Sequence, residues 1–329
     1  MLDNATQSVL DEIDKAQLNN SLVKTVGTPN YFASVVDTNQ NYIAHCTDGV
    51  GSKIKHLIKH EMYDVIGKDC FAMNYNDLLC VGANAVSFQN HITSMPLQQY
   101  IIPKVISGIT EYCKHSFTML TGGETEILQQ TNFHISGSMM GMIQKDKLID
   151  GTRVEHGDVI LGLPSSGIHA NGWTAISKRM PELITPENLT ATKIYDREIM
   201  TLLARVENPC AIINITGGGF RNLERIPNNF QYELTFDYTP DPFKDLRCEF
   251  SHQELYTTFN MGIGMIVIVK MKDLAKSLDA MKDSRVIGGV VENDRPNVVV
   301  QGQDIFFGDS EPYVFKEKEI YEEYKLGDN

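Results

Sequence analysis

Four glycine-rich polar turns recur along this 329-residue chain, and each directly follows a segment predicted as a β-strand. Glycine lets the backbone approach a ligand closely, and open α/β sheets bind ligands beyond the carboxyl ends of their strands. Such turns predict an α/β protein whose binding residues come from several loops. The four turns span residues 47–53, 121–126, 164–172 and 216–220.

Hydrophobic periodicity between the turns predicts two successive runs of alternating strands and helices. In the first run we expect strands at 42–46, 85–91, 117–120 and 133–143 and helices at 5–24, 64–81 and 97–115. In the second we expect strands at 159–163, 211–215, 263–269, 285–291 and 297–300 and helices at 172–180, 196–206 and 272–281. Because a chain of this length usually forms two domains, we predict one over residues 1–152 and another over 153–329. The second domain should end in an acidic, solvated tail.

Charge balance and cysteine usage narrow the class of protein. The chain carries 29 basic and 42 acidic residues, a net charge of −13, so nucleic acid and anionic membranes are poor partners. Its longest apolar run, Met261 to Val269, is too short to cross a membrane, and the amino terminus is acidic where a signal peptide is basic. The six cysteines form no C-x-x-C pair, which favours reduced thiols over a zinc site or disulfides. These features predict a soluble, cytoplasmic protein.

The first glycine-rich turn is the strongest local signal for phosphate binding. It contains Asp48, Gly49, Gly51, Ser52 and Lys53. Its spacing is not that of a P-loop, but an acid, a hydroxyl and a lysine beside two glycines could serve a magnesium triphosphate. A tight turn with a surface lysine is the alternative interpretation.

Four polar residues interrupt the otherwise apolar helix predicted at 64–81, namely Asp69, Asn74, Asn76 and Asp77. Helical spacing places positions 69 and 77 on one face, and positions 74 and 77 are also neighbours. Buried carboxylates need a cation or a hydrogen-bond partner, and Mg²⁺ usually bridges protein carboxylates to substrate phosphates. The stripe therefore predicts a magnesium site, with a solvated helix face as the alternative.

The other three turns offer further ligand contacts. In the second turn, Gly122 and Gly123 precede Glu124. The third supplies hydroxyls, glycine amides and a helix amino terminus as an anion cradle, and its His169 is suited to proton transfer near neutral pH. The fourth holds three consecutive glycines, 217–219, which imply close approach of the backbone to another group. Ordinary turns and a helix-capping loop are the alternatives.

Taken together and in order, these segments resemble the aminoimidazole ribonucleotide synthetase family, also called phosphoribosylformylglycinamidine cyclo-ligase. The resemblance covers about residues 42 to 300, and its motifs here are TDGVGSK, IGKDCFAMNYNDLLCVGA, LTGGET, LPSSGIHANG, ITGGGF and LYTTFNMGIGM. The wider superfamily includes formylglycinamidine ribonucleotide synthetase, selenophosphate synthetase, thiamine monophosphate kinase and a hydrogenase maturation protein. The last three motifs favour the cyclo-ligase within that group.

The resemblance implies a fold and a reaction. The fold is α/β (α+β), with two domains that are each a small mixed sheet covered by helices. A homodimer is implied, in which the first domains form a barrel across the interface and ATP binds nearby. Apolar residues around 85–88 and 133–143 agree with a sheet face that needs a partner. The implied reaction uses ATP and Mg²⁺ to close the imidazole ring of formylglycinamidine ribonucleotide, releasing ADP and phosphate.

The resemblance also implies roles for individual residues. Asp77 and His169 would be catalytic, and Asp48, Asp77 and Glu124 would hold the metal ion. ATP would contact Asp48, Gly49, Gly51, Ser52, Lys53, Gly122 and Gly123, with Asp69 in support. The substrate would contact Ser165, Ser166, Asn171, Gly172, Gly217, Gly218 and Asn260.

Four departures from the family pattern leave alternatives open. The region that normally holds a glycine-rich nucleotide loop reads VGTPNYFAS, and Glu126, His134 and Thr257 replace or displace the usual residues. One alternative is another ATP-dependent phosphate-transfer enzyme of the same superfamily. The other is a divergent nucleotide-binding homologue without turnover.

Overall fold

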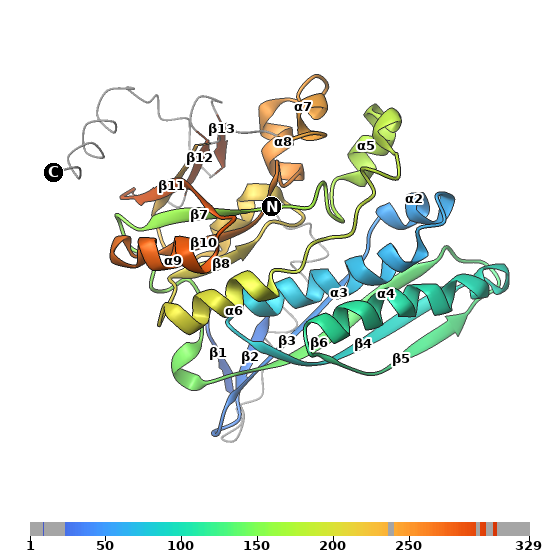
Figure 1. The fold of residues 1–329 in the computed structure, drawn as a ribbon, viewed down its shortest axis with the longest axis horizontal. Coiled ribbons are helices and arrows are strands. Elements are labelled where there is room, and N and C mark those ends of the chain that lie inside the picture. Colours follow the sequence, from blue (N-terminus) through green and yellow to red (C-terminus); the bar gives the residue numbers. More distant parts are fainter. Residues whose placement is uncertain (1–8, 10–23, 236–239, 294–296, 301–304, 308–329) are drawn as a thin grey trace.

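The computed structural model describes residues 9, 24–235, 240–293, 297–300 and 305–307. The predicted acidic tail and nearly all of the predicted helix at 5–24 lie outside these residues. The described part forms two domains, each a mixed sheet with helices (Figure 1). No helix in the described ranges is long and apolar enough to cross a membrane.

The first domain contains a six-stranded sheet in the order β1-β2-β3-β6-β4-β5. All neighbouring strands are antiparallel except β4 and β5, which are parallel. The strands are β1 (Lys24–Val26), β2 (Ser34–Asp37), β3 (Tyr42–Gly49), β4 (Asn84–Ser94), β5 (Met119–Ile127) and β6 (His134–Ile143).

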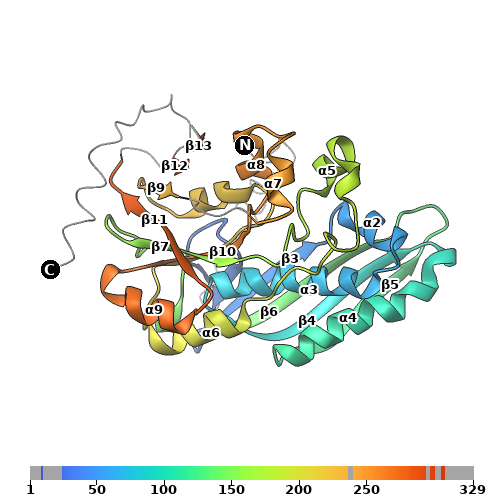
Figure 2. The same ribbon diagram turned by 45° about the horizontal axis from the view of Figure 1, so that its top comes forward.

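Helices of the first domain cover one face of this sheet (Figures 1 and 2). They are α2 (Lys53–Lys59), α3 (Tyr63–Cys80), the 3-10 turn η1 (Pro96–Ile101) and α4 (Ile102–His115). Fifteen of the 18 residues of α3 are buried, because the sheet, α4 and the second domain all pack against it. Two glycines allow α3 and α4 to touch: a Cβ on Gly67 would lie 1.9 Å from the carbonyl oxygen of Val105, and one on Gly108 would lie 1.9 Å from that of Asp64.

The second domain contains a seven-stranded sheet in the order β13-β12-β9-β11-β7-β10-β8, in which only β12 and β9 are parallel. Its strands are β7 (Val159–Pro164), β8 (Ala211–Asn214), β9 (Gln231–Leu234), β10 (Ile263–Val269), β11 (Arg285–Val291), β12 (Asn297–Val300) and β13 (Ile305–Phe307). Its helices are α5 (Trp173–Arg179), α6 (Asp196–Arg205), α7 (Phe243–Leu246), α8 (His252–Thr258) and α9 (Leu274–Ala280). Its short 3-10 turns are η3 (Pro181–Leu183), η4 (Gly219–Arg225) and η5 (Met271–Asp273), whereas η2 (Lys145–Lys147) follows β6 at the end of the first domain.

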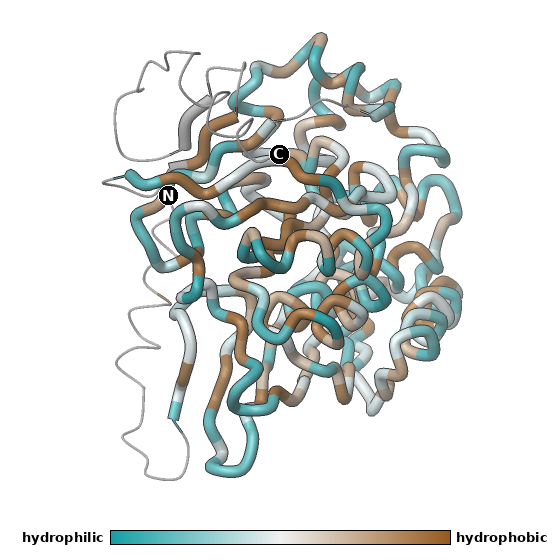
Figure 3. The backbone as a smooth tube through the Cα atoms, turned by 60° about the vertical axis from the view of Figure 1, so that its left-hand side comes forward, coloured by the Kyte–Doolittle hydropathy of each residue, from teal (hydrophilic) through white to brown (hydrophobic). Residues whose placement is uncertain are grey.

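Buried apolar residues form a hydrophobic core that continues through both domains. The inner strand β10, between β7 and β8, is buried along its whole length, as expected for a strand covered on both faces. Figure 3 shows hydrophobic stretches of the backbone gathered toward the middle of the molecule and hydrophilic ones at many of its outer bends. The six cysteines form no disulfide, and five of them are buried.

The predicted strands and helices from residue 42 to residue 300 are confirmed except for the strand at 117–120, because β5 begins at Met119 and continues to Ile127. Two glycine-rich segments are not turns. Asp48 and Gly49 belong to β3, and residues 121–126 belong to β5. Sequence periodicity also missed β1, β2, β9, β13, α2, α7 and α8. These elements are three to seven residues long, shorter than the windows in which periodicity is clear.

Candidate nucleotide and substrate site between the two domains

Asp48 lies at the end of β3, where a buried amide from α3 fixes its backbone. The Asn74 side chain accepts a hydrogen bond from the Asp48 backbone N–H (3.0 Å) and donates one to the Asp48 carbonyl (3.2 Å). The Asp48 carboxylate accepts the Gly49 N–H at 2.7 Å. Burial nevertheless raises the pKa of this carboxyl group, against the effects of that hydrogen bond and of Arg225.

Asp77 lies one helical turn beyond Asn74 and faces the second domain. Its Oδ1 accepts a hydrogen bond from Asn214 Nδ2 at the end of β8 (2.9 Å). Burial raises the Asp77 pKa to about 7; the Asn214 hydrogen bond opposes the rise, the charge of Asp48 adds to it, and Arg225 opposes it. Asp48 and Asp77 are therefore two carboxyl groups whose pKa values burial raises, and the charge of Asp48 adds to the rise at Asp77.

These two carboxyl groups fit a magnesium ion, which is commonly held by one or two carboxylates together with substrate phosphates. Glu124, the third predicted ligand, does not join them. Strand register aligns Asp48 with Gly137, Asn90 and Gly123 on the helix-covered face, so Glu124 is on the opposite face. It is also three strand spacings away, about 14 Å. No cluster of three acidic, histidine or cysteine ligands occurs among the described residues.

The other residues of the first motif have different surroundings: Gly51 and Ser52 are at least partly exposed, whereas Lys53 is buried. Gly51 has open space where a Cβ would be, and the Ser52 hydroxyl lies 2.7 Å from that of Thr174 in α5. Lys53, in contrast, is fully buried and forms an ion pair with Asp69 at 2.8 Å. The predicted phosphate contact by Lys53 is therefore not supported, since its ammonium group is already neutralised inside the protein.

The predicted stripe on α3 is mainly structural. Asn74 binds β3, and Asn76 donates to the Lys193 carbonyl (2.9 Å) and accepts from the Tyr195 N–H (3.2 Å). Asp69 is occupied by Lys53. Only Asp77 keeps a carboxyl group that faces the space between the domains, so both the four-residue magnesium stripe and the solvated-face alternative are wrong.

Gly122 and Gly123 lie inside the edge strand β5. A Cβ on Gly123 would lie 2.4 Å from the Asn90 carbonyl oxygen, whereas Gly122 has open space around it. Close packing against β4 therefore accounts for Gly123 without a ligand. The structure places neither glycine beside Asp48.

The predicted substrate loop, residues 165–172, is organised by Asn260. The Asn260 Nδ2 donates to the carbonyls of Gly167 (2.9 Å) and Ile168 (3.2 Å), and its Oδ1 accepts from Ser165 Oγ (3.1 Å). Asn260 is buried, so it supports the loop from beneath. A Cβ on Gly172, whose φ is +88°, would lie 2.4 Å from the Phe259 ring.

His169 does not have the environment of a general acid or base at neutral pH. It is buried, and its Nε2 lies 3.2 Å from the Ser166 N–H as the acceptor. Burial first, and then the charges of Lys53 and Lys193, lower its pKa to about 3. The proton-transfer role predicted from the sequence is not supported; this histidine holds the loop.

The fourth glycine-rich turn lies beside both the loop and the acid pair. A Cβ on Gly217 would lie 3.4 Å from Asn171 Oδ1, and β8 ends at Asn214, the partner of Asp77. Gly218 has a φ of +90° and is exposed. The structure thus brings Asp77, Asn171 and this turn to one region between the domains.

Sequence reasoning missed Arg225 and Asn214. Arg225 donates to the Tyr31 carbonyl (2.9 Å), stacks on Phe32 (4.8 Å from the ring centre) and lowers the pKa of both Asp48 and Asp77. Asn214 could not be predicted as a site residue, because no sequence motif marks the last residue of a strand such as β8. Arg225 could have been suspected only from its place six residues after the last glycine.

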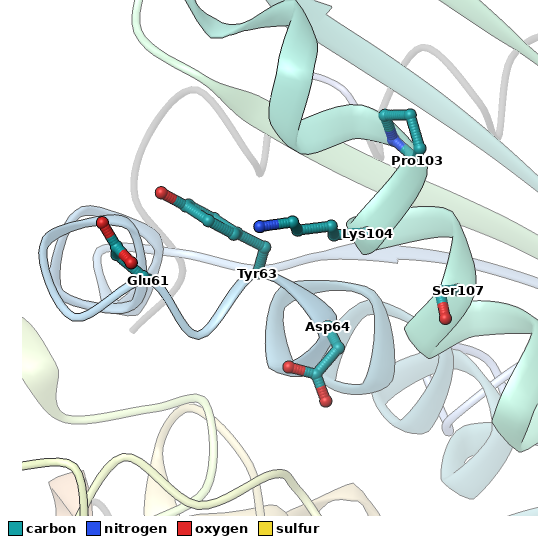
Figure 4. Close-up of a pocket in the computed structure, with 6 residues that line it drawn as sticks. All are labelled: Glu61, Tyr63, Asp64, Pro103, Lys104 and Ser107. Atoms are coloured by element: carbon teal, nitrogen blue, oxygen red, sulfur yellow. The ribbon is translucent and has the colours of Figure 1, made fainter.

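Two of the hollows near the surface of the described residues differ in their relation to the predicted site. One, of about 380 Å³, opens beside the substrate loop and is lined by Gly172, Thr174, Ala175, Lys178, Arg179, Phe250, Glu254 and Thr258. The other, of about 310 Å³, lies between the start of α3 and α4 (Figure 4). In the second, the Lys104 ammonium lies 4.9 Å from the Tyr63 ring centre, and none of the predicted site residues is present.

The two mixed sheets and the acid pair between them define a two-domain α+β protein with a site at the domain junction. Two family models match it: the N-terminal domain of AIR synthase related protein matches residues 32–143, and the C-terminal domain matches residues 155–301. The chain belongs to the AIR synthase related family.

Curated relatives narrow the comparison. The phosphoribosylformylglycinamidine cyclo-ligase of Alkaliphilus oremlandii is 31% identical over 318 residues, covering 88% of this chain and 93% of the relative. The enzyme of the same name from Methanosarcina barkeri is 34% identical over 301 residues, covering 82% and 87%.

Solved structures share the fold at low sequence identity. The T. maritima PurL structure complexed with FGAR aligns with a TM-score of 0.65 at 15% identity, covering 90% of this chain and 51% of that one. A hydrogenase maturation protein, HypE, in complex with ATP aligns with a TM-score of 0.62 at 16% identity, covering 83% and 85%. These likenesses concern the fold alone.

Proposed function

We propose that this protein is an ATP-dependent phosphoribosylformylglycinamidine cyclo-ligase, which closes the imidazole ring of formylglycinamidine ribonucleotide in purine biosynthesis. The observation that carries the proposal is the similarity to enzymes of this name at 31% and 34% identity over more than four-fifths of the chain. A different phosphate-transfer activity is not favoured, because the superfamily members compared above are only 15% and 16% identical.

The chemistry requires a good leaving group at the formyl carbon. Transfer of the γ-phosphoryl group of ATP to the formamide oxygen provides it, and the amidine nitrogen then attacks that carbon and expels phosphate. ADP and phosphate are the co-products. Most of the enzyme's contribution to such a reaction is positioning and charge stabilisation.

Each half of the site has a role in this proposal. Asp48 and Asp77 would hold Mg²⁺, which would neutralise phosphate charge when bound. Residues 165–172 and the turn at 217–219 would hold the ribonucleotide, with Asn171 between them. His169 and Asn260 would keep the loop in shape rather than react.

We also propose that the protein is a homodimer and that it is cytoplasmic. The face of the first sheet opposite α3 and α4 is not covered by helices of the described chain (Figure 1). Met119, Met140, Met142 and Val86 are exposed, and register places the three methionines on this face. The apolar residues Phe88, Ile135 and Met139, in contrast, are buried on the helix side, so they do not need a partner.

Complementation tests the proposed function directly in cells. The full chain, expressed in a purine auxotroph that lacks this ligase step, should restore growth without added purine. An Asp77→Asn variant, expressed at the same level, is the matched control and should fail. Soluble, folded protein that does not restore growth would contradict the proposal.

A further inference from the structure

An irregular segment of the second domain, Thr190–Tyr195, runs along the first domain and is bound there through its backbone. We call it the strap. The side chains that bind it come from α2, α3 and α4. Lys53 Nζ donates to the Thr190 carbonyl (2.6 Å), and Asp69 Oδ1 accepts from the Thr192 N–H (2.7 Å). Tyr112 donates to the Thr192 carbonyl (3.0 Å), and Asn76 binds both Lys193 and Tyr195.

The same strap holds the predicted substrate loop on its other side. Thr190 Oγ1 donates to the Ser166 carbonyl (3.0 Å), and Ser166 Oγ donates to the Ala191 carbonyl (2.7 Å). Further along, the Tyr195 hydroxyl donates to the Pro164 carbonyl (3.0 Å). The strap is therefore the hydrogen-bonded connection between helix α3 and the loop.

The buried Lys53–Asp69 ion pair anchors the strap to the first domain. Both side chains have zero solvent exposure, and their charged atoms are 2.8 Å apart. A buried charge that loses its partner is strongly destabilised, so neither group can turn away to solvent at low cost. Each group also binds the strap backbone, so the pair fixes the position of Thr190 and Thr192 relative to α3.

We propose that Lys53 and Asp69 are positioning residues, which act through the strap to hold residues 165–169 in the conformation that binds the substrate. The inference rests on the proposed function for the identity of the substrate. It assigns to the lysine of the first glycine-rich motif a role in the other domain. The competing assignment is a direct contact between Lys53 and a nucleotide phosphate.

Trp173 provides a reporter of the loop that needs no substrate. It is the single tryptophan of the chain and is fully buried. Its Nε1 donates to the His169 carbonyl at 2.7 Å, so its environment depends on how residues 165–169 are held. Loosening the loop should increase quenching of Trp173 fluorescence by acrylamide.

The decisive variant is Thr190→Val, which removes the hydroxyl bonded to Ser166 and leaves the carbonyl bonded to Lys53. Thr201→Val is the matched control, because the Thr201 hydroxyl bonds only within α6, to the Arg197 carbonyl. We expect Thr190→Val to raise the KM for formylglycinamidine ribonucleotide about fivefold, the effect of one lost hydrogen bond, with ATP affinity unchanged. Lys53→Met should raise that KM further, and only these two variants should increase Trp173 quenching.

Two results would overturn the inference. One is a Thr190→Val enzyme with the substrate KM and Trp173 quenching of the Thr201→Val control. The other is a Lys53→Met enzyme that loses ATP affinity while its substrate KM is unchanged. A wild-type enzyme inactive on formylglycinamidine ribonucleotide would contradict the proposed function instead, and the quenching comparison would still decide the role of the strap.

Discussion

The carboxyl group of Asp77 links the charge of the site to the stability of the ligand-free protein. Its pKa is raised to about 7 by burial and by Asp48. An acid with a raised pKa binds its proton more tightly in the folded state, so the folded protein loses stability as the pH rises from about 4 to about 7. Bound Mg²⁺ would remove this penalty, because it favours the ionised form.

We therefore predict opposite effects of Asp77→Asn on stability and on turnover. Thermal unfolding of the ligand-free variant should show a gain of a few kcal/mol over wild type at pH 8, about 1.4 kcal/mol for each unit of raised pKa, and the gain should disappear near pH 4. Turnover should be abolished, since the proposed metal contact would be worth several kcal/mol in charge stabilisation. Near-normal activity, or a stability gain that does not depend on pH, would remove Asp77 from the proposed metal site.

His169 permits a second prediction at the level of one residue. His169 has a φ of 66°, a left-handed conformation that asparagine adopts more readily than most other non-glycine residues. Its role here is to accept a hydrogen bond from the Ser166 N–H. His169→Asn should raise the substrate KM and leave kcat within about tenfold of wild type, which is below the usual contribution of a general acid or base. If steady-state kinetics showed a loss of about 10²- to 10⁴-fold in kcat at unchanged KM, His169 would be the proton-transfer group instead.

Secondary-structure elements were predictable where periodicity extends over many residues. The long helix α3 and the strands β3, β4 and β6 follow from their apolar patterns. Strand β5 did not, because it is an exposed edge strand whose glycines and acids read as a turn. The neutralisation of Lys53 by Asp69 was equally hidden, since a pattern of residues does not reveal which helices meet.

The close contact between helices α3 and α4 predicts that an added methyl group there will destabilise the protein. Gly67→Ala would place a methyl group against the Val105 carbonyl and force the helices apart. We expect a loss of about 1–3 kcal/mol in unfolding free energy, more than the small gain in helix propensity can offset. Denaturant unfolding should show this loss for Gly67→Ala and a much smaller change for Gly51→Ala, where the space is open and the backbone is not left-handed. Equal values would contradict the close contact.

At the scale of the whole molecule, the arrangement of two domains was predictable and the composition of the site only in part. Sequence order singled out the acid of β3, the acid of α3 and the glycine loops of the second domain, which the structure brings to the domain junction, and their roles stay predictions. It could not show that Glu124 lies on the opposite face of the sheet from Asp48, because that depends on strand register.

If the protein is a dimer through the uncovered face of the first sheet, a substitution on that face should weaken dimerisation and lower activity. Met140→Glu would add a charge to that face, and sedimentation should show a shift to monomer together with lower specific activity. Met271→Glu changes an exposed methionine of the second domain and should affect neither property. A wild-type protein that is a fully active monomer at micromolar concentration would contradict the proposed dimer.

The most direct test of the proposed function is to count products in one reaction. Purified protein should be incubated with ATP, Mg²⁺ and formylglycinamidine ribonucleotide, with ADP and the aminoimidazole product both measured by chromatography. We predict equal amounts of the two products, and almost no ADP when the ribonucleotide is omitted. ADP released at the same rate without it, or ADP formed without the closed ring, would contradict the cyclo-ligase assignment.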